Sequence, residues 1–190
     1  VLANDVNHED LDAVFVDINA DGFQDLYVVS GGNEENAQTD FYLDRLYLND
    51  QNNGFVKTPI TDLMPESGSK VLPADYDGDG DIDLFVAGRI NPHQYPLPAT
   101  SQLLINESGT LSNQTTTIAP DFKDLGLVTD AVWSDVDQDG DLDLLVVGEW
   151  MPVTVFLNQN NQLVKQDFAS LADTSGWWFS IEKGDFDKDG

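Results

Sequence analysis

The sequence predicts an all-β protein built from units of four antiparallel strands, arranged as the blades of a β-propeller. Two observations lead to this prediction. A nine-residue aspartate-rich segment starts at Asp17, Asp75 and Asp135, with a shortened copy at Asp185, and the starts are 58, 60 and 50 residues apart. Short runs of Val, Leu, Ile and aromatic residues surround every copy and end at Gly, Asn, Asp or Pro, as β-strands do. A period of about 50 residues with four strands is typical of a propeller blade.

The elements of each unit follow in a fixed order. The first strand precedes the aspartate segment, and the second follows it and ends at small residues, so the segment is predicted to be a hairpin. A third strand ends in an aliphatic residue followed by asparagine, and a fourth comes within about ten residues. The expected first strands are 13–16, 71–74 and 131–133; the second 26–29, 84–87 and 144–147; the third end at Asn49, Asn106 and Asn158; the fourth surround 55–56, 111 and 163–164.

These units divide residues 1–190 into a single partial β-propeller. Its predicted parts are blade 1 at about 11–60, blade 2 at about 69–118, blade 3 at about 128–168 and the start of blade 4 at about 176–190. A superhelical β-solenoid is the rival architecture, but solenoid repeats are usually shorter. Because an open arc exposes an edge at each end, we expect the rest of a longer chain to complete the propeller.

Composition excludes several classes of partner. The chain has 8 basic and 35 acidic residues and a formal charge of −27. This charge repels a phosphate backbone or an anionic lipid surface, so neither nucleic acid nor membrane insertion is expected. No apolar run is long enough for a membrane-spanning helix. There is no cysteine, which excludes disulfides and cysteine-based zinc sites. Divalent cations are the obvious counter-charge.

The repeated segment has the residue types that calcium requires, since calcium takes about six to eight oxygen ligands. Side chains at positions 1, 3, 5 and 9 and the backbone carbonyl at position 7 can converge on one ion, and glycine at position 6 permits the turn. The predicted ligands form three complete sites and a fourth partial one: Asp17, Asn19, Asp21, Phe23 and Asp25; Asp75, Asp77, Asp79, Asp81 and Asp83; Asp135, Asp137, Asp139, Asp141 and Asp143; and Asp185, Asp187 and Asp189.

Two other interpretations of the segment are weaker. An EF-hand needs a glutamate at position 12 and flanking helices, but position 12 is Val28, Val86 or Val146, each within an apolar run. An ordinary Asp-Gly turn explains one copy but not three in register. The second and third loops have five aspartates each, whereas the first has three and Asn19, so the first is expected to bind calcium more weakly. Calcium is expected to be required for stability.

The pattern Asp-x-Asp/Asn-x-Asp-Gly-x-x-Asp, followed by an apolar strand and glycine, resembles the FG-GAP/VCBS repeats of integrin α-chain propellers. It is most similar to bacterial and extracellular members related to cartilage acidic protein, above all in segment 135–152 with its Gly-Glu-Trp-Met-Pro ending. The resemblance covers nearly the whole chain. It implies calcium in each hairpin, an extracellular, cell-surface or periplasmic location, and recognition or adhesion of a protein or glycan ligand. The FG-GAP half of the integrin consensus is only loosely kept, so integrin-type ligand binding does not carry over.

The remaining residues do not indicate an enzyme. There is no cysteine or Gly-x-Ser-x-Gly motif, and the two histidines, His8 and His93, have no acid partner that spacing supports. The segment Trp177-Trp178-Phe179 could stack on sugar, but packing between blades is favoured. Trp133 and Trp150 are likewise expected in the core or at the rim. An accessory carbohydrate-binding or scaffold domain of a larger extracellular enzyme is the alternative function, and a structural spacer is a third.

Overall fold

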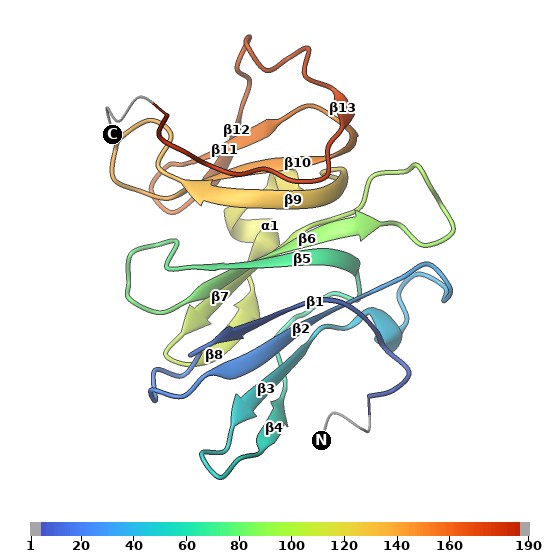
Figure 1. The fold of residues 1–190 in the computed structure, drawn as a ribbon, viewed down its shortest axis with the longest axis vertical. Coiled ribbons are helices and arrows are strands. Elements are labelled where there is room, and N and C mark those ends of the chain that lie inside the picture. Colours follow the sequence, from blue (N-terminus) through green and yellow to red (C-terminus); the bar gives the residue numbers. More distant parts are fainter. Residues whose placement is uncertain (1–4, 187–190) are drawn as a thin grey trace.

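Each complete repeat unit forms one antiparallel sheet, with its strands in sequence order (Figure 1). The structure is a computed structural model that describes residues 5–186. Blade 1 contains β1 (Glu9–Val16), β2 (Asp25–Gly31), β3 (Arg45–Asn49) and β4 (Phe55–Thr58); blade 2 contains β5 (Ser67–Ala74), β6 (Asp83–Ile90), β7 (Gln102–Glu107) and β8 (Thr110–Asn113); blade 3 contains β9 (Leu127–Ser134), β10 (Asp143–Met151), β11 (Thr154–Asn158) and β12 (Leu163–Gln166). The all-β prediction and the four-stranded unit are confirmed.

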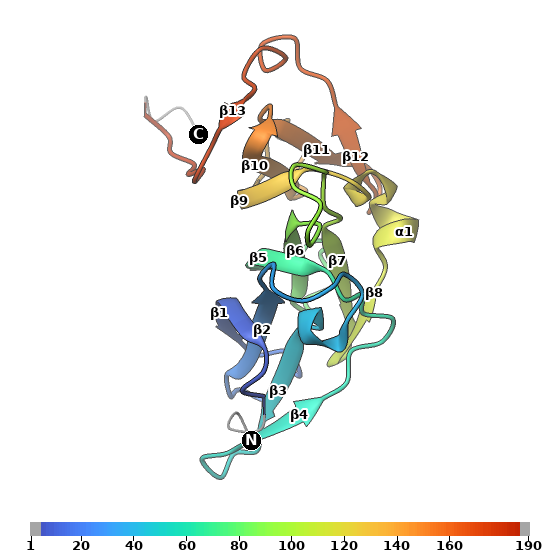
Figure 2. The ribbon, with the colours of Figure 1, turned by 90° about the vertical axis from the view of Figure 1, so that its right-hand side faces the viewer.

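The three sheets stack face to face along the molecule, with blades 1 and 3 at opposite ends (Figures 1 and 2). The first strands β1, β5 and β9 lie side by side. Blade 2 lies between two neighbours, which explains its continuous apolar second strand. Because side chains alternate across a sheet, Leu84 packs in the cluster shared with blade 1 and Phe85 in the cluster shared with blade 3.

Two buried apolar clusters hold the blades together. The cluster between blades 1 and 2 includes Tyr27 and Leu104, both fully buried. In the cluster between blades 2 and 3, the Phe122 ring makes edge-to-face contacts with Phe85 and Phe156, at centroid distances of 5.2 and 5.0 Å. Such pairs add to the stability that comes from burial alone. Trp133, with 8% of its surface exposed, belongs to this cluster, as predicted.

Short helical turns lie in the connection between β2 and β3 and in that between β8 and β9. They are η2 (Asp40–Tyr42), α1 (Thr115–Ile118) and η3 (Pro120–Phe122), and the last two carry buried Ala119 and Phe122 into the core. The strand pattern alone did not predict them. Within residues 5–186, no helix has the length and apolarity needed to cross a membrane.

The described part of the fourth repeat contains one short strand, β13 (Gly176–Trp177), which pairs with the end of β10. The expectation that Trp177, Trp178 and Phe179 pack between blades is wrong here, since they are 53%, 38% and 77% exposed. No further sheet covers them among the described residues. Instead the Trp177 ring contacts the Trp150 ring, and the Trp178 indole donates to the carbonyl of Thr174.

Candidate metal centres

The three complete aspartate loops, residues 17–25, 75–83 and 135–143, lie at the same end of the blades. Each joins the first strand of its blade to the second, on the left in Figure 1. The predicted hairpin is therefore confirmed in every complete unit. Of the fourth copy, Asp187 and Asp189 lie outside the described residues, and Asp185 lies inside them.

The aspartate at position 9 starts the second strand and is buried in all three loops. It is accommodated there because both carboxylate oxygens accept backbone hydrogen bonds. One oxygen accepts the amide of loop position 2, at 3.0, 3.1 and 2.7 Å for Ile18, Tyr76 and Val136. The other accepts a hydrogen bond from the amide of the asparagine at or next to the end of the third strand, at 2.8, 2.8 and 2.9 Å for Asn49, Asn106 and Asn158.

The carboxylates of positions 1, 3 and 9 converge in the second and third loops. One oxygen of each lies within 4.8 Å of the others, in the groups Asp75–Asp77–Asp83 and Asp135–Asp137–Asp143. Position 1 is held toward the loop centre because it accepts the amide of the glycine at position 6, at 2.8, 3.2 and 3.1 Å in the three loops. The first loop has the amide of Asn19 in place of the second carboxylate.

The predicted ligands at positions 5 and 7 lie outside these groups of three carboxylates. The position 5 carboxylate accepts the amide of position 7 in every loop, at 2.9, 2.8 and 2.9 Å for Asp21, Asp79 and Asp139. At position 7, Phe23 points to solvent with 45% exposure, and the Asp81 carboxylate accepts the amide of Ser108 at 2.7 Å. A role for the position 5 carboxylate and the position 7 carbonyl as ligands stays a prediction.

The electrostatics of the second and third loops favour a bound cation. Burial raises the pKa of Asp83 to about 7, although it accepts two amide hydrogen bonds. Partial loss of solvent around the carboxyl, and then repulsion by neighbouring carboxylates, raise the pKa of Asp77 and Asp137 as well. The Oδ1 atom of Asp75 is buried without a hydrogen-bond partner. A cation at this point would stabilise the charged form of these groups and satisfy that oxygen, so the residues present fit a metal ion.

Two features of the loops were missed by the sequence analysis. Position 4 has a left-handed backbone, with φ of 54°, 74° and 63° at Ala20, Gly78 and Gln138. Asn106 and Asn158, near the ends of the third strands of blades 2 and 3, also donate to the loop of the preceding blade. The recurrence of this asparagine at the same place in every unit was the signal that could have indicated the second role.

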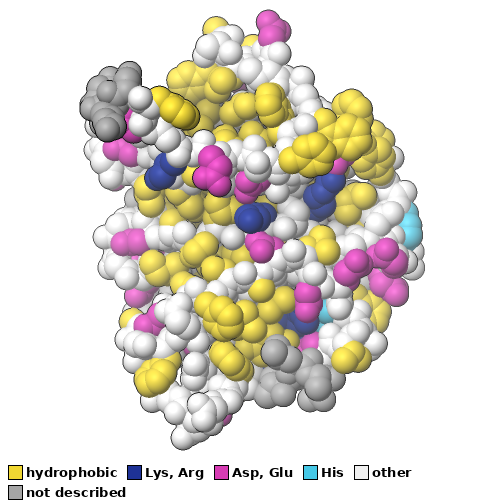
Figure 3. All heavy atoms as spheres, viewed as in Figure 1, with side chains coloured by type: hydrophobic (Ala, Val, Ile, Leu, Met, Phe, Trp, Pro, Cys, Tyr) yellow, Lys and Arg dark blue, Asp and Glu magenta, His cyan; other side chains and the backbone are white. Residues whose placement is uncertain are grey.

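A different cluster of exposed aromatic side chains lies at the opposite ends of the strands, where β6 and β10 finish. It contains Tyr95, Trp150 and Trp177, which are 50%, 61% and 53% exposed. Figure 3 shows hydrophobic side chains gathered near β13 and the end of β10, next to a basic side chain. Arg89 forms an ion pair there with the buried Glu149.

The chain matches the FG-GAP-like repeat family over three overlapping stretches, residues 17–86, 75–146 and 135–190. Each stretch begins at the first residue of one of the aspartate loops, so the match follows the same repeat that forms the blades. No curated protein matches the sequence. The matched stretches cover most of the chain, which therefore belongs to the FG-GAP-like repeat family.

Proposed function

We propose that this chain is a calcium-binding propeller segment of a secreted, cell-surface or periplasmic protein, in which calcium has a structural role and the blades serve recognition or adhesion. The observation that carries the metal proposal is the convergence of three carboxylates in each of two loops, with one buried oxygen of Asp75 unpartnered. The donor atoms are all oxygens, which favours a hard cation over zinc. Bound calcium would hold the hairpin by joining position 9, at the start of the second strand, to positions 1 and 3.

A calcium titration followed by thermal unfolding, with and without chelator, tests this proposal. We expect at least two bound ions and a lower melting temperature when calcium is removed. Asp77→Asn should weaken binding because it removes one of the converging carboxylates. Asp62→Asn is the matched control, since it makes the same charge change at an exposed residue outside the loops. Equal melting temperatures with and without chelator, or fewer than two ions, would contradict the proposal.

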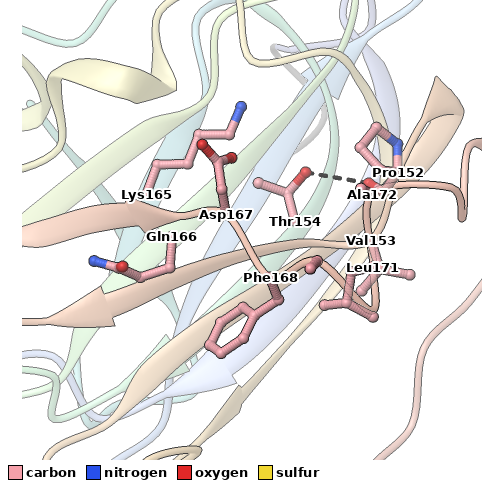
Figure 4. Close-up of a pocket in the computed structure, with 10 residues that line it drawn as sticks. Pro152, Val153, Thr154, Lys165, Gln166, Asp167, Phe168, Leu171 and Ala172 are labelled. Carbon is pink, nitrogen blue, oxygen red and sulfur yellow. Dashed lines mark hydrogen bonds between the residues drawn. The ribbon is translucent and has the colours of Figure 1, made fainter.

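The pocket in Figure 4 is formed by the start of β11, the end of β12 and the segment that follows β12. It lies at the outer edge of blade 3, has a volume of about 360 Å³ and is lined mainly by apolar residues such as Val153, Phe168 and Leu171. The polar side chain of Thr154 is turned to the carbonyl of Pro152, at 3.1 Å. Lys165 and Asp167 are its charged residues. This is an apolar hollow on a sheet edge rather than a convergence of catalytic groups.

We also propose that further blades cover the free face of blade 1. Phe15 on this face is 61% exposed. Trp133 occupies the position of Phe15 in blade 3, and there it packs against the preceding blade with its indole 3.5 Å from the carbonyl of Leu72. A preceding blade would bury Phe15 in the same way. A longer piece of the parent chain that includes it should protect Phe15 and raise the melting temperature.

The aromatic cluster favours a carbohydrate-binding function as the second candidate. The Trp150 indole donates to the Tyr95 hydroxyl at 2.7 Å, and that hydroxyl lies 3.3 Å from Glu149. These bonds fix two exposed rings beside Trp177, whose centroid is 5.3 Å from that of Trp150. Trp150 has φ of 60°, an uncommon conformation for a bulky residue that often marks a functional site. Fixed, exposed aromatic faces suit the apolar face of a sugar ring.

Binding of soluble neutral oligosaccharides, followed by tryptophan fluorescence, tests this second function. Trp150→Ala should abolish a fluorescence response that the native chain shows. Phe168→Ala is the matched control, because Phe168 is an exposed aromatic residue outside the cluster, at 39% exposure. A response that survives in Trp150→Ala places any sugar site elsewhere and contradicts the role of the cluster.

A further inference from the structure

A continuous line of hydrogen bonds joins the three aspartate loops through buried groups. The first residue of this line is Asn106, the penultimate residue of β7, which is fully buried. The Asn106 backbone amide donates to Asp83, the position 9 residue of its own loop, at 2.8 Å. The Asn106 side-chain amide donates to the carbonyl of Ile18 in blade 1, also at 2.8 Å and 88 residues away in the chain. One residue thus contacts two loops.

Blade 3 repeats the same arrangement. Asn158 closes β11 and is 2% exposed. Its backbone amide donates to Asp143 at 2.9 Å, and its side-chain amide donates to the carbonyl of Tyr76 in blade 2 at 3.0 Å. Two blade interfaces therefore carry the same contact between equivalent residues. Such a buried amide has to be satisfied, since an unpaired one costs free energy.

Both accepting carbonyls belong to loop position 2, between the predicted ligands at positions 1 and 3. The same residue donates its amide to the position 9 aspartate of its loop, at 3.0 Å from Ile18 to Asp25 and 3.1 Å from Tyr76 to Asp83. Position 2 is therefore held from both sides, by its own loop and by the next blade. Hydrogen bonds therefore connect Asp25 to Asp143 through Ile18, Asn106, Asp83, Tyr76 and Asn158.

Blade 1 provides a comparison within the molecule. Asn49 occupies the same position, and its backbone amide donates to Asp25 at 2.8 Å. Its side-chain amide donates at 3.2 Å to the carbonyl of Gln24, within its own blade, and is exposed. No blade precedes it in the described residues. Asn106 makes the equivalent contact within its own blade, with the carbonyl of Ile82 at 3.2 Å, and its contact with the preceding blade is additional to this local one.

We propose that Asn106 and Asn158 are positioning residues that couple calcium binding between adjacent blades, an inference that rests on the calcium binding proposed above. An ion bound in one loop fixes its position 9 aspartate and, through the asparagine, the position 2 peptide of the preceding loop. The preceding loop then loses less conformational freedom when it binds its own ion. The coupling is positive and reciprocal, so each loop also strengthens binding in the next.

A double-mutant cycle on the whole chain tests the coupling at the interface of blades 2 and 3. The four proteins are the native chain, Asp137→Asn, which weakens the blade 3 loop, Asn158→Asp, which replaces the amide donor, and the double variant. Calorimetric titration gives the calcium dissociation constant of the blade 2 loop in each. In the native background, Asp137→Asn should raise this constant by a factor of about 5 or more. In the Asn158→Asp background it should have no further effect.

Asn49→Asp is the matched control, because its side-chain amide contacts only its own blade. In this background the effect of Asp137→Asn should persist in full. If Asp137→Asn leaves the blade 2 constant at its native value while calcium still binds, the coupling is refuted and the proposed function stands. If the native chain binds no calcium, both are refuted.

A second measurement keeps the test decisive if Asn158→Asp does not fold. Hydrogen exchange of the Tyr76 amide, which donates to Asp83, reports the order of the blade 2 loop directly. With calcium present, this amide should exchange several-fold faster in Asp137→Asn than in the native chain. Equal exchange rates in the two proteins would overturn the proposal.

Discussion

At the scale of single residues, each loop turns through two left-handed positions that differ in their tolerance of side chains. Position 6 is glycine, with φ of 88°, 96° and 97°, which lies beyond the left-handed region that other residues adopt. Position 4 has φ between 54° and 74° and holds Ala20 and Gln138 as well as Gly78. A Cβ added at Gly80 or Gly78 meets no atom within 4 Å, so backbone conformation alone decides the effect of alanine.

We therefore expect Gly80→Ala to destabilise the chain by about 1–3 kcal/mol and to weaken calcium binding, because it forces an L residue into a strained conformation. Gly78→Ala, at the position that Ala20 occupies in the first loop, should cost less than about 1 kcal/mol. Urea denaturation with saturating calcium measures both. Equal losses in the two variants would show that the position 6 backbone is not the constraint.

A buried carboxyl outside the loops gives a pH dependence. Burial raises the pKa of Asp44 to about 7 from its ordinary value of 3.8. Between pH 4 and 7 the unfolded chain loses this proton first, so the folded chain binds more protons and the free energy of unfolding falls as pH rises, by at most about 1.4 kcal/mol per unit. The Asp44→Asn variant should not show this loss, and can still accept from Ser30 and pair with the Tyr27 hydroxyl.

Denaturation of both proteins at several pH values, in saturating calcium, gives their free energies of unfolding. The difference between the two free energies isolates the contribution of Asp44. The native chain should become less stable relative to Asp44→Asn between pH 4 and pH 7. A constant difference across this range would mean that Asp44 stays ionised in the folded chain.

Much of the residue-scale site is predictable because its constraints are local. The spacing of Asp75, Asp77 and Asp83 fixes which carboxylates can meet within one hairpin, and Gly80 follows from the turn. The bond from Asn106 to Ile18 is not predictable in this way, since it depends on how one blade sits against another. The exposed Trp177 was likewise misjudged, because burial depends on a neighbouring sheet rather than on its own strand.

At the scale of elements, the first strands of successive blades are joined by side chains that reach across. The Asp12 carboxylate on β1 accepts the amide of Val71 on β5 at 3.1 Å, and Asp130 on β9 accepts the amide of Ile181 at the same distance. Both aspartates lie five residues before an aspartate loop. The strand order and the hairpins could be predicted from the sequence repeat. These contacts could not, because they depend on how the blades stack on one another.

Asp12→Ala should destabilise the chain by about 1.5–3 kcal/mol, because it leaves the amide of buried Val71 without its charged acceptor. Asp12→Asn keeps an acceptor and should recover part of the loss. Lys70→Ala is the control: Lys70 lies 3.9 Å from the same carboxylate, but the pair is partly exposed and should be worth under about 1 kcal/mol. Urea denaturation compares the three. If Lys70→Ala loses as much stability as Asp12→Ala, the stabilising effect of Asp12 comes from its attraction to Lys70 and not from its hydrogen bond to Val71.

At the scale of the whole molecule, the three complete loops hold 13 of the 35 acidic residues behind the formal charge of −27. Two bound divalent ions would bring the charge from −27 to −23 and remove repulsion within the most crowded carboxylate groups. Without calcium, salt screens that repulsion, and the screening length is about 30 Å at 0.01 M and about 3 Å at 1 M ionic strength.

Sodium chloride should therefore raise the melting temperature of the calcium-free chain more than that of the calcium-loaded chain. The double variant Asp77→Asn, Asp137→Asn, measured in chelator, should gain less from salt than the native chain, because one carboxylate is removed from each converging group. A variant with two neutralised surface carboxylates outside the loops, Asp62→Asn and Asp121→Asn, controls for net charge. If both double variants respond to salt alike, repulsion is spread over the whole surface, and the loops are not the places where charge opposes folding.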